Sequence, residues 1–213
     1  MTVELLPLTA KATLEEVGGK ALNLMRMARA GFPVPSGFVV PTDAYRAFVA
    51  QNGLQAVIAR ALAEAAPDAP FALEAASARI REAFYRGQLP AGLPEALERA
   101  WRDLGASPVA VRSSATAEDL PDLSFAGQQE TYLNVVGAEA LQQAVLGCWA
   151  SLWTARAIGY RARNGIPHEE AALAVVVQQM VPADVSGVLF TANPLTGRRT
   201  ETVIEATLGL GEA

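Results

Sequence analysis

The sequence predicts an α+β plan, in which helices and strands occupy different parts of the chain. Two observations carry this prediction. Up to about residue 104, apolar residues recur at helical spacing, whereas after Ser107-Pro108 short apolar runs of strand length follow one another. With 51% hydrophobic and 18% charged residues, the chain holds ample apolar material for a core. We therefore expect two lobes: residues 1–107, mostly helical, and residues 108–213, rich in strands.

The helical half begins with a helix whose apolar positions form a broad face and which ends at Gly31, in the usual stop position. Thr42 or Asp43 can cap the helix after it. Prolines separate the later helices. The elements expected in this half are helices over 20–30, 42–52, 54–65, 71–86 and 93–104 and a short strand over 38–40.

In the second half, a buried strand over 109–111 leads into a polar stretch from Arg112 to Gly127. A long loop without secondary structure is commonly functional or disordered, and the residues of this one favour function. Cys148, Trp149 and Trp153 favour packing in the core over ligand contact. The other elements expected are strands over 131–135, 172–181, 185–191 and 201–206 and one long helix over 138–164.

Composition excludes several classes of protein. The net charge of −5 provides no broad electrostatic footprint for nucleic acid, so a bound polyanion must be held by a few placed cations and backbone amides. A single cysteine, Cys148, allows no internal disulfide and indicates a reducing compartment. The start of the chain lacks the pattern of a signal peptide, and the apolar run 171–177 is too short to span a bilayer. We expect a cytoplasmic protein without membrane segments.

The first candidate site is Gly18-Gly19-Lys20, directly before a helix. Glycines let a backbone approach a ligand closely, and a helix N-terminus followed by a lysine attracts phosphate. The alternative is a tight turn with a solvated lysine. The segment is not a P-loop, because the spacing and the Ser/Thr after the lysine are missing.

The second candidate is Arg112 with Ser113, Ser114 and Thr116, at the end of an apolar strand. A guanidinium fork suits phosphate oxygens, and the hydroxyls add donors. The alternative is a helix-capping segment, and the spacing does not decide between the two.

Three further segments carry weaker signals. Gly127 lies in a turn before the strand that holds Thr131, and such a turn can cover a nucleotide. Gln178 ends an apolar strand whose backbone can offer donors and acceptors to an adenine edge, or it is an ordinary strand end. Glu205 and Glu212 bracket a glycine-rich turn and can hold Mg²⁺ against phosphate, although acidic pairs are usually solvated surface.

Taken together and in this order, the motifs resemble one family, the ATP-binding part of phosphoenolpyruvate synthases, pyruvate phosphate dikinases and rifampicin phosphotransferases. The resemblance covers about residues 10–213, and over 54–104 it extends only to being helical. The segments that carry it are GGKALNL at 18–24, VRSSATAED at 111–119, SFAGQQ at 124–129, CWASLW at 148–153 and SGVLFTANP at 186–194.

The resemblance implies an ATP-grasp fold, in which two lobes clamp ATP. By similarity, Lys20 and Arg112 hold the phosphates and carry catalysis by positioning and neutralising charge. The other residues implied at the nucleotide are Gly18, Gly19, Ser113, Gly127, Thr131, Gln178 and the backbone at Met180 and Val181. Glu205 and Glu212 resemble the acids that bind Mg²⁺.

The family also carries a histidine domain that accepts the phosphoryl group and a domain for the final acceptor. We expect both, and the rest of the nucleotide-binding lobe, to be missing from this chain. His168 lacks the Gly-Ser-His context of the carrier histidine and receives no catalytic role. The expected function is the ATP-binding portion of a dikinase that passes the β-phosphoryl of ATP to histidine and on to pyruvate. The alternatives are a rifampicin phosphotransferase, a stand-alone nucleotide-binding protein without catalysis, and a degraded remnant.

Overall fold

The computed structural model describes residues 3–65, 69–116 and 130–211. Contacts within the chain divide it into two compact units, one ending at Met180 and one beginning at Val181. Residue 107, where the composition changes, lies inside the first unit. The division falls elsewhere because strands from before and after residue 107 pair in one sheet.

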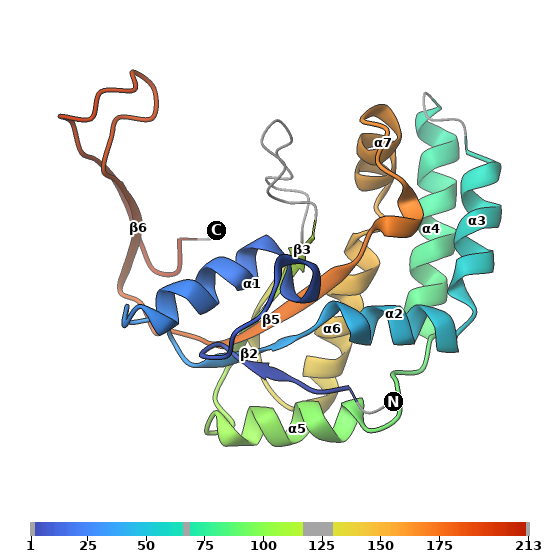
Figure 1. Ribbon diagram of the computed structural model, residues 1–213, viewed down its shortest axis with the longest axis horizontal. Helices are drawn as coiled ribbons and strands as arrows, with labels where there is room; N and C mark the ends of the chain where they lie inside the picture. The colour runs from blue at the N-terminus through green and yellow to red at the C-terminus, as the bar shows by residue number, and fades with distance from the viewer. Residues whose placement is uncertain (1–2, 66–68, 117–129, 212–213) are drawn as a thin grey trace. The chain divides into compact units, whose positions relative to one another are not determined.

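The first unit is built on an antiparallel sheet with the strand order β1-β2-β5-β3-β4 (Figure 1). Its central strand, β5, is buried on both faces. Val175 and Val177 belong to a large core on one face, while Ala174 and Val176 belong to a small core on the other. The strands are β1 (Leu6–Pro7), β2 (Gly37–Val40), β3 (Val109–Ala115), β4 (Thr131–Val135) and β5 (Leu173–Gln179).

Helices cover both faces of this sheet. Helix α1 packs on β3 and β5 from the side of the small core, whereas α2 and α6 pack on β5 from the side of the large core (Figure 1). We call the side that α1 covers the α1 face. The helices are α1 (Leu14–Arg29), α2 (Thr42–Gln51), α3 (Leu54–Ala63), α4 (Pro70–Arg86), α5 (Leu93–Asp103), α6 (Ala138–Ser151) and α7 (Ala155–Arg163), with a 3-10 turn η1 (His168–Glu170) before β5.

The predicted α+β class is confirmed, and most predicted elements lie within a few residues of their observed bounds. Two predictions were wrong. The expected helix over 138–164 is two helices, because Thr154 caps α7, its hydroxyl accepting from the backbone N–H of Ala157 at 3.2 Å. The strand expected to end at residue 111 continues to Ala115, because β5 pairs with it along its whole length.

The second unit contains one antiparallel pair, β6 (Val185–Phe190) and β7 (Val203–Leu208). The turn between them is ordered by Asn193, whose side-chain oxygen accepts from the backbone N–H groups of Leu195 and Thr196. Most side chains on both strands are exposed, as expected for two strands with no further sheet to pack on. None of the helices in the described parts of the chain is long and apolar enough to cross a membrane.

Candidate functional site

Helix α1 is interrupted at Gly18, and this break aims the lysine that follows it. A capping box between Thr13 and Glu16 starts the first turn. Gly18 then adopts φ 71° and ψ 170°, a conformation that is essentially restricted to glycine. The helix resumes at once, so that Gly19 and Lys20 occupy its first turn. The predicted glycine-rich turn before a helix therefore exists, and its last residue is the lysine.

Gly18 is also required by packing against β3. A Cβ atom added to it would lie 2.6 Å from both the carbonyl carbon and the hydroxyl of Ser114. Ser114 is completely buried. Its hydroxyl donates to the carbonyl of Val17 at 2.8 Å and accepts from the backbone N–H of Ala21 at 3.0 Å. Ser114 of β3 thus caps the resumed helix. Helix α1 cannot cap this segment itself, because Gly18 directly before it has no side chain.

The ammonium group of Lys20 lies against the same strand. Its Nζ donates to the carbonyl of Ser113 at 2.7 Å, one residue from Arg112. The Arg112 side chain lies on the α1 face, because successive residues of a strand alternate between faces and Ser114 points to α1. The Nε of Arg112 is buried and has no hydrogen-bond partner in the described part of the chain. The side chains of Lys20 and Arg112, which are far apart in the sequence, therefore lie on the same side of the sheet.

Thr131 and Gln178 lie on this side as well. Arg112 is paired with Thr131 on β4 and with Val176 on β5, and directly paired residues of antiparallel strands share a face. Gln178 is two residues after Val176, and its amide nitrogen donates to the carbonyl of Pro35 at 3.1 Å. The α1 face thus brings together Lys20, Arg112, Thr131 and Gln178 from one helix and three strands.

The structure also shows where Ser113, Met180 and Val181, three further residues predicted at the nucleotide, direct their hydrogen-bonding groups. The hydroxyl of Ser113 points to the opposite face and donates to the carbonyl of Glu130 at 3.3 Å, so only the carbonyl of Ser113 lies beside Lys20. The pleat of β3 separates it from Arg112. The backbone N–H of Met180 donates to the carbonyl of Pro108 at 3.0 Å, which leaves that donor occupied. The carbonyl of Val181, at the start of the second unit, accepts from the N–H of Ala183.

Of the two predicted metal ligands, only Glu205 lies in the described residues. Glu205 lies exposed on β7, paired with Val188, while Glu212 and Gly127 lie outside the described residues. In residues 3–65, 69–116 and 130–211, no three acidic, histidine or cysteine side chains cluster as a metal site would require. The two cationic side chains on the α1 face suit phosphate oxygens.

From the sequence, Ser114 is only one hydroxyl among several, and its role in joining β3 to α1 was missed. The only sequence signal for it is the glycine at residue 18, which the packing requires. A second missed feature is a buried cation on the other side of the sheet. The side chain of Arg161 is 1% exposed, and its Nε donates to Nδ1 of His168 at 3.0 Å.

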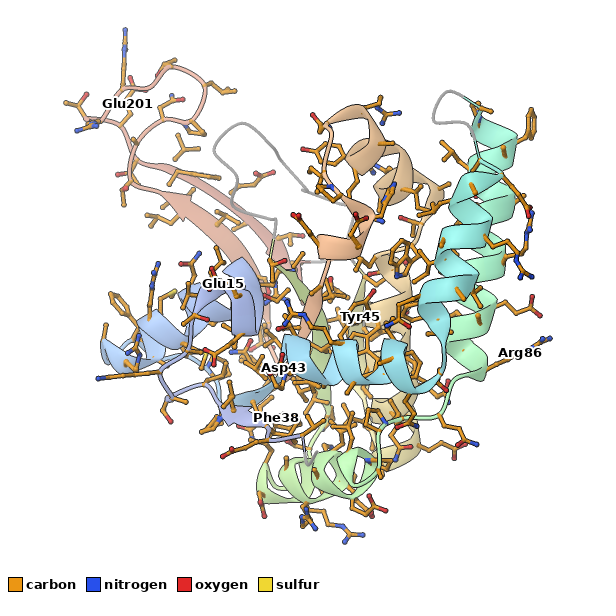
Figure 2. All side chains as sticks on the ribbon, turned by 45° about the vertical axis from the view of Figure 1, so that its right-hand side comes forward. Glu15, Phe38, Asp43, Tyr45, Arg86 and Glu201 are labelled. Atoms are coloured by element: carbon orange, nitrogen blue, oxygen red, sulfur yellow. The ribbon has the colours of Figure 1, made fainter. Side chains whose placement is uncertain are left out.

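This second cation lies among aromatic side chains. The Arg161 guanidinium carbon is 5.0 Å from the centre of the Trp153 ring, and the indole N–H of Trp153 donates to the hydroxyl of Tyr45 at 3.0 Å. Figure 2 shows Tyr45 on the inner side of α2. Burial lowers the pKa of Arg161 to about 10, and burial followed by the charge of Arg161 lowers the pKa of His168. The prediction that Trp153 serves packing is confirmed.

Comparison with known proteins places the chain in one family. Residues 14–213 match the family described as "Pyruvate phosphate dikinase, AMP/ATP-binding domain". The chain is 50% identical to the phosphoenolpyruvate synthase of Aeropyrum pernix over 210 residues, covering 95% of this chain and 26% of that protein. It is 49% identical to the rifampicin phosphotransferase of Streptomyces sviceus, covering 92% of this chain and 23% of that one. A probable phosphoenolpyruvate synthase of Pyrococcus abyssi is 43% identical, covering 92% and 29%.

The chain thus spans about a quarter of the length of these relatives. The shared segment runs through every element of the first unit from α1 onward and through both strands of the second. This segment contains Lys20 and Arg112, the two cations of the α1 face, and also Gly18, where α1 is interrupted. On this evidence the chain belongs to the family of the pyruvate phosphate dikinase AMP/ATP-binding domain.

Proposed function

We propose that this chain binds ATP over the α1 face, as the nucleotide-binding part of a phosphotransferase with ATP-grasp architecture. The observation that carries the proposal is the position of Lys20. Its ammonium reaches β3 at the carbonyl next to Arg112, on the face to which the Arg112 guanidinium points. Because the chain has a net charge of −5, its surface as a whole does not attract a polyphosphate. Two cations on one face can neutralise a polyphosphate locally.

Each group would act through position and charge. Arg112 is anchored in β3 between the buried residues Val111 and Ser113, with β4 and β5 paired on either side, and a guanidinium binds phosphate oxygens through two parallel N–H donors. Lys20 adds a point charge at the first turn of a helix, where the helix dipole also favours an anion. Mg²⁺ would neutralise further phosphate charge, and Glu205 and Glu212 are the proposed ligands. Phosphoryl transfer needs mainly such positioning and charge stabilisation.

The reaction proposed for the whole protein transfers the β-phosphoryl of ATP to a carrier histidine. One water is consumed, and AMP and phosphate are the other products. The histidine belongs to a domain outside this chain and would pass its phosphoryl group to pyruvate. Rifampicin is the alternative acceptor, because one relative at 49% identity is named a rifampicin phosphotransferase.

Calorimetric titration with ATP and Mg²⁺ tests the binding proposal. Replacing Arg112 by Met removes charge-assisted hydrogen bonds to phosphate, each of which contributes about 1.5–3 kcal/mol. We therefore expect the affinity for ATP to fall about 10- to 100-fold. The matched control is Arg86→Met, since Arg86 projects into solvent from the end of α4 (Figure 2). Equal affinities of the Arg112→Met protein and the unchanged chain would refute the assigned role.

A second experiment tests transfer. The chain is mixed with a separately produced histidine domain of the family and with ATP labelled at either the β- or the γ-phosphate. The proposal expects the β-label on the histidine domain and the γ-label in free phosphate. ATP binding without any labelled histidine would favour the alternative of a nucleotide-binding protein without catalysis.

A further inference from the structure

The structure assigns a positioning role to Ser114, whose hydroxyl bonds to the backbone of α1. We propose that its hydroxyl holds Lys20 beside Arg112 by fixing the break in α1, and this rests on the proposed function of Lys20. The contacts on both sides of the break carry the inference. Val17 precedes Gly18 and Ala21 follows it, and the hydroxyl of Ser114 bonds to both.

The two hydrogen bonds are directional and complementary. Ser114 donates its single proton to the carbonyl of Val17 and accepts the N–H of Ala21 with a lone pair. The carbonyl of Val17 lies directly before the break at Gly18, and the N–H of Ala21 lies three residues after it, in the first turn of the resumed helix, where the regular i to i−4 bonding cannot be made. The side chain is completely buried, so an unpaired donor or acceptor there carries the full cost of desolvation. One hydroxyl therefore completes the bonding of two segments of α1.

Consecutive residues of α1 are bound to consecutive residues of β3. Lys20 contacts Ser113 through its ammonium, and Ala21 contacts Ser114 through its backbone. A lysine side chain has considerable rotational freedom, so the position of its Nζ depends on where its backbone is held. Fixing Ala21 to β3 holds the Lys20 backbone within reach of the strand that carries Arg112. Without that bond, the first turn of the helix can shift or rotate along the sheet.

Gly18 also contributes to the contact between Ser114 and α1. Its missing Cβ lets α1 approach Ser114 so closely that any side chain at residue 18 would overlap it. The close approach makes the hydroxyl of Ser114 reach both backbone groups. Ser151 of α6 is a buried serine outside this face, and its hydroxyl donates to the carbonyl of Cys148 in its own helix at 2.7 Å. It provides a matched control for removal of a buried serine hydroxyl.

The test compares Ser114→Ala with Ser151→Ala by titration with two probes, ATP with Mg²⁺ and adenosine, which has no phosphate. We expect Ser114→Ala to weaken ATP binding about tenfold and to leave adenosine binding within about twofold. Ser151→Ala should leave the affinity for both probes within about twofold. A merely structural role of Ser114 would weaken both probes in parallel, and that result would overturn the proposal.

A double-mutant cycle sharpens the test. If Ser114 acts through Lys20, then Ser114→Ala has no further effect on ATP affinity once Lys20→Met is present. Additive losses would overturn the proposal. Should Ser114→Ala fail to fold, Ser114→Cys replaces it, because a thiol is only a weak hydrogen-bonding group of similar shape.

The proposal and the proposed function fail in distinguishable ways. If the unchanged chain binds ATP and Lys20→Met weakens it, but Ser114→Ala does not, only the role of Ser114 is refuted. If the unchanged chain binds no ATP, the proposed function is refuted. The role of Ser114 is then decided by a crystal structure of the Ser114→Ala protein. Retention of the 2.7 Å contact between Lys20 Nζ and the Ser113 carbonyl would overturn it, and loss of that contact would support it.

Discussion

The first unit holds positively charged side chains on both sides of its sheet, and the two regions differ in how far these side chains are buried and in what surrounds them. On the α1 face, Lys20 and Arg112 are both partly buried, and Lys20 bonds to a backbone carbonyl. On the other side, Arg161 is 1% exposed, bonded to His168 and stacked over Trp153. Arg161 is enclosed, and both of its terminal nitrogens lack a hydrogen-bond partner in the described residues, whereas Lys20 and Arg112 are only partly buried.

The comparison shows that burial of a cation does not by itself indicate a ligand site. Desolvation lowers the pKa of Arg161 to about 10, and an aromatic ring and an imidazole compensate part of that cost. We interpret Arg161 as a structural residue, whose stem and planar head fill space between α7 and η1. The α1 face, by contrast, depends on a backbone conformation that only glycine adopts well. The backbone strain at Gly18 and the packing of Arg161 against Trp153 can therefore be tested by separate mutations.

The largest effect is expected for Gly18→Ala. The substitution forces alanine into φ 71° and ψ 170° and places a Cβ against Ser114, so we expect the free energy of unfolding to fall by about 4 kcal/mol. Gly53→Ala is the matched control, because Gly53 has φ 62° with nothing within 4 Å of an added Cβ. It should cost only about 1–2 kcal/mol. Urea denaturation measures both, and equal losses would show that the packing on Ser114 has no energetic weight.

A smaller effect is expected at Arg161, and it distinguishes packing from charge. Arg161→Ala leaves a cavity beside Trp153 and should cost about 3 kcal/mol. Arg161→Met keeps much of the volume without the charge and should change the free energy of unfolding by less than about 1.5 kcal/mol. Neither substitution should alter the affinity for ATP. Urea denaturation measures the stability of both proteins, and equal destabilisation would assign the stabilisation to the charge of Arg161. A weaker affinity of either protein for ATP would contradict the contrast between Arg161 and the α1 face.

The smallest effect is a pH dependence at His168, the only histidine of the chain. Its pKa is lowered in the folded state, first by burial and then by Arg161, so the unfolded chain binds the proton more readily. The associated stability is fully present above the unfolded pKa of about 6.5 and is lost as the pH falls through the folded pKa.

Thermal unfolding between pH 7.5 and 5 measures this dependence. His168→Asn is the control, because its amide oxygen can accept from Arg161 and does not titrate. We expect the control to lose less stability than the unchanged chain over this interval. Identical pH dependence of both proteins would contradict a lowered pKa of His168 in the folded state.

Local pattern determined much of this protein. Helical spacing located the helices of the first half, and alternating or continuous apolar runs located β5, β6 and β7. The glycine pair and Lys20 before a helix, and Arg112 after an apolar strand, are also visible in the sequence, because glycine conformations and side-chain charge are properties of single residues. These local features are sufficient to indicate the family and the two cations.

Tertiary structure alone decided how these pieces combine. The strand that carries Arg112 extends to Ala115 only because β5 lies beside it, and that extension sends Ser113 and Ser114 to opposite faces. The helix expected after β4 breaks before Ala155, where Trp153 bonds to Tyr45 of α2. The physical reason is the same in both cases. Strand pairing and side-chain contacts join residues far apart in the sequence, and their free energy outweighs the local preference of a short segment.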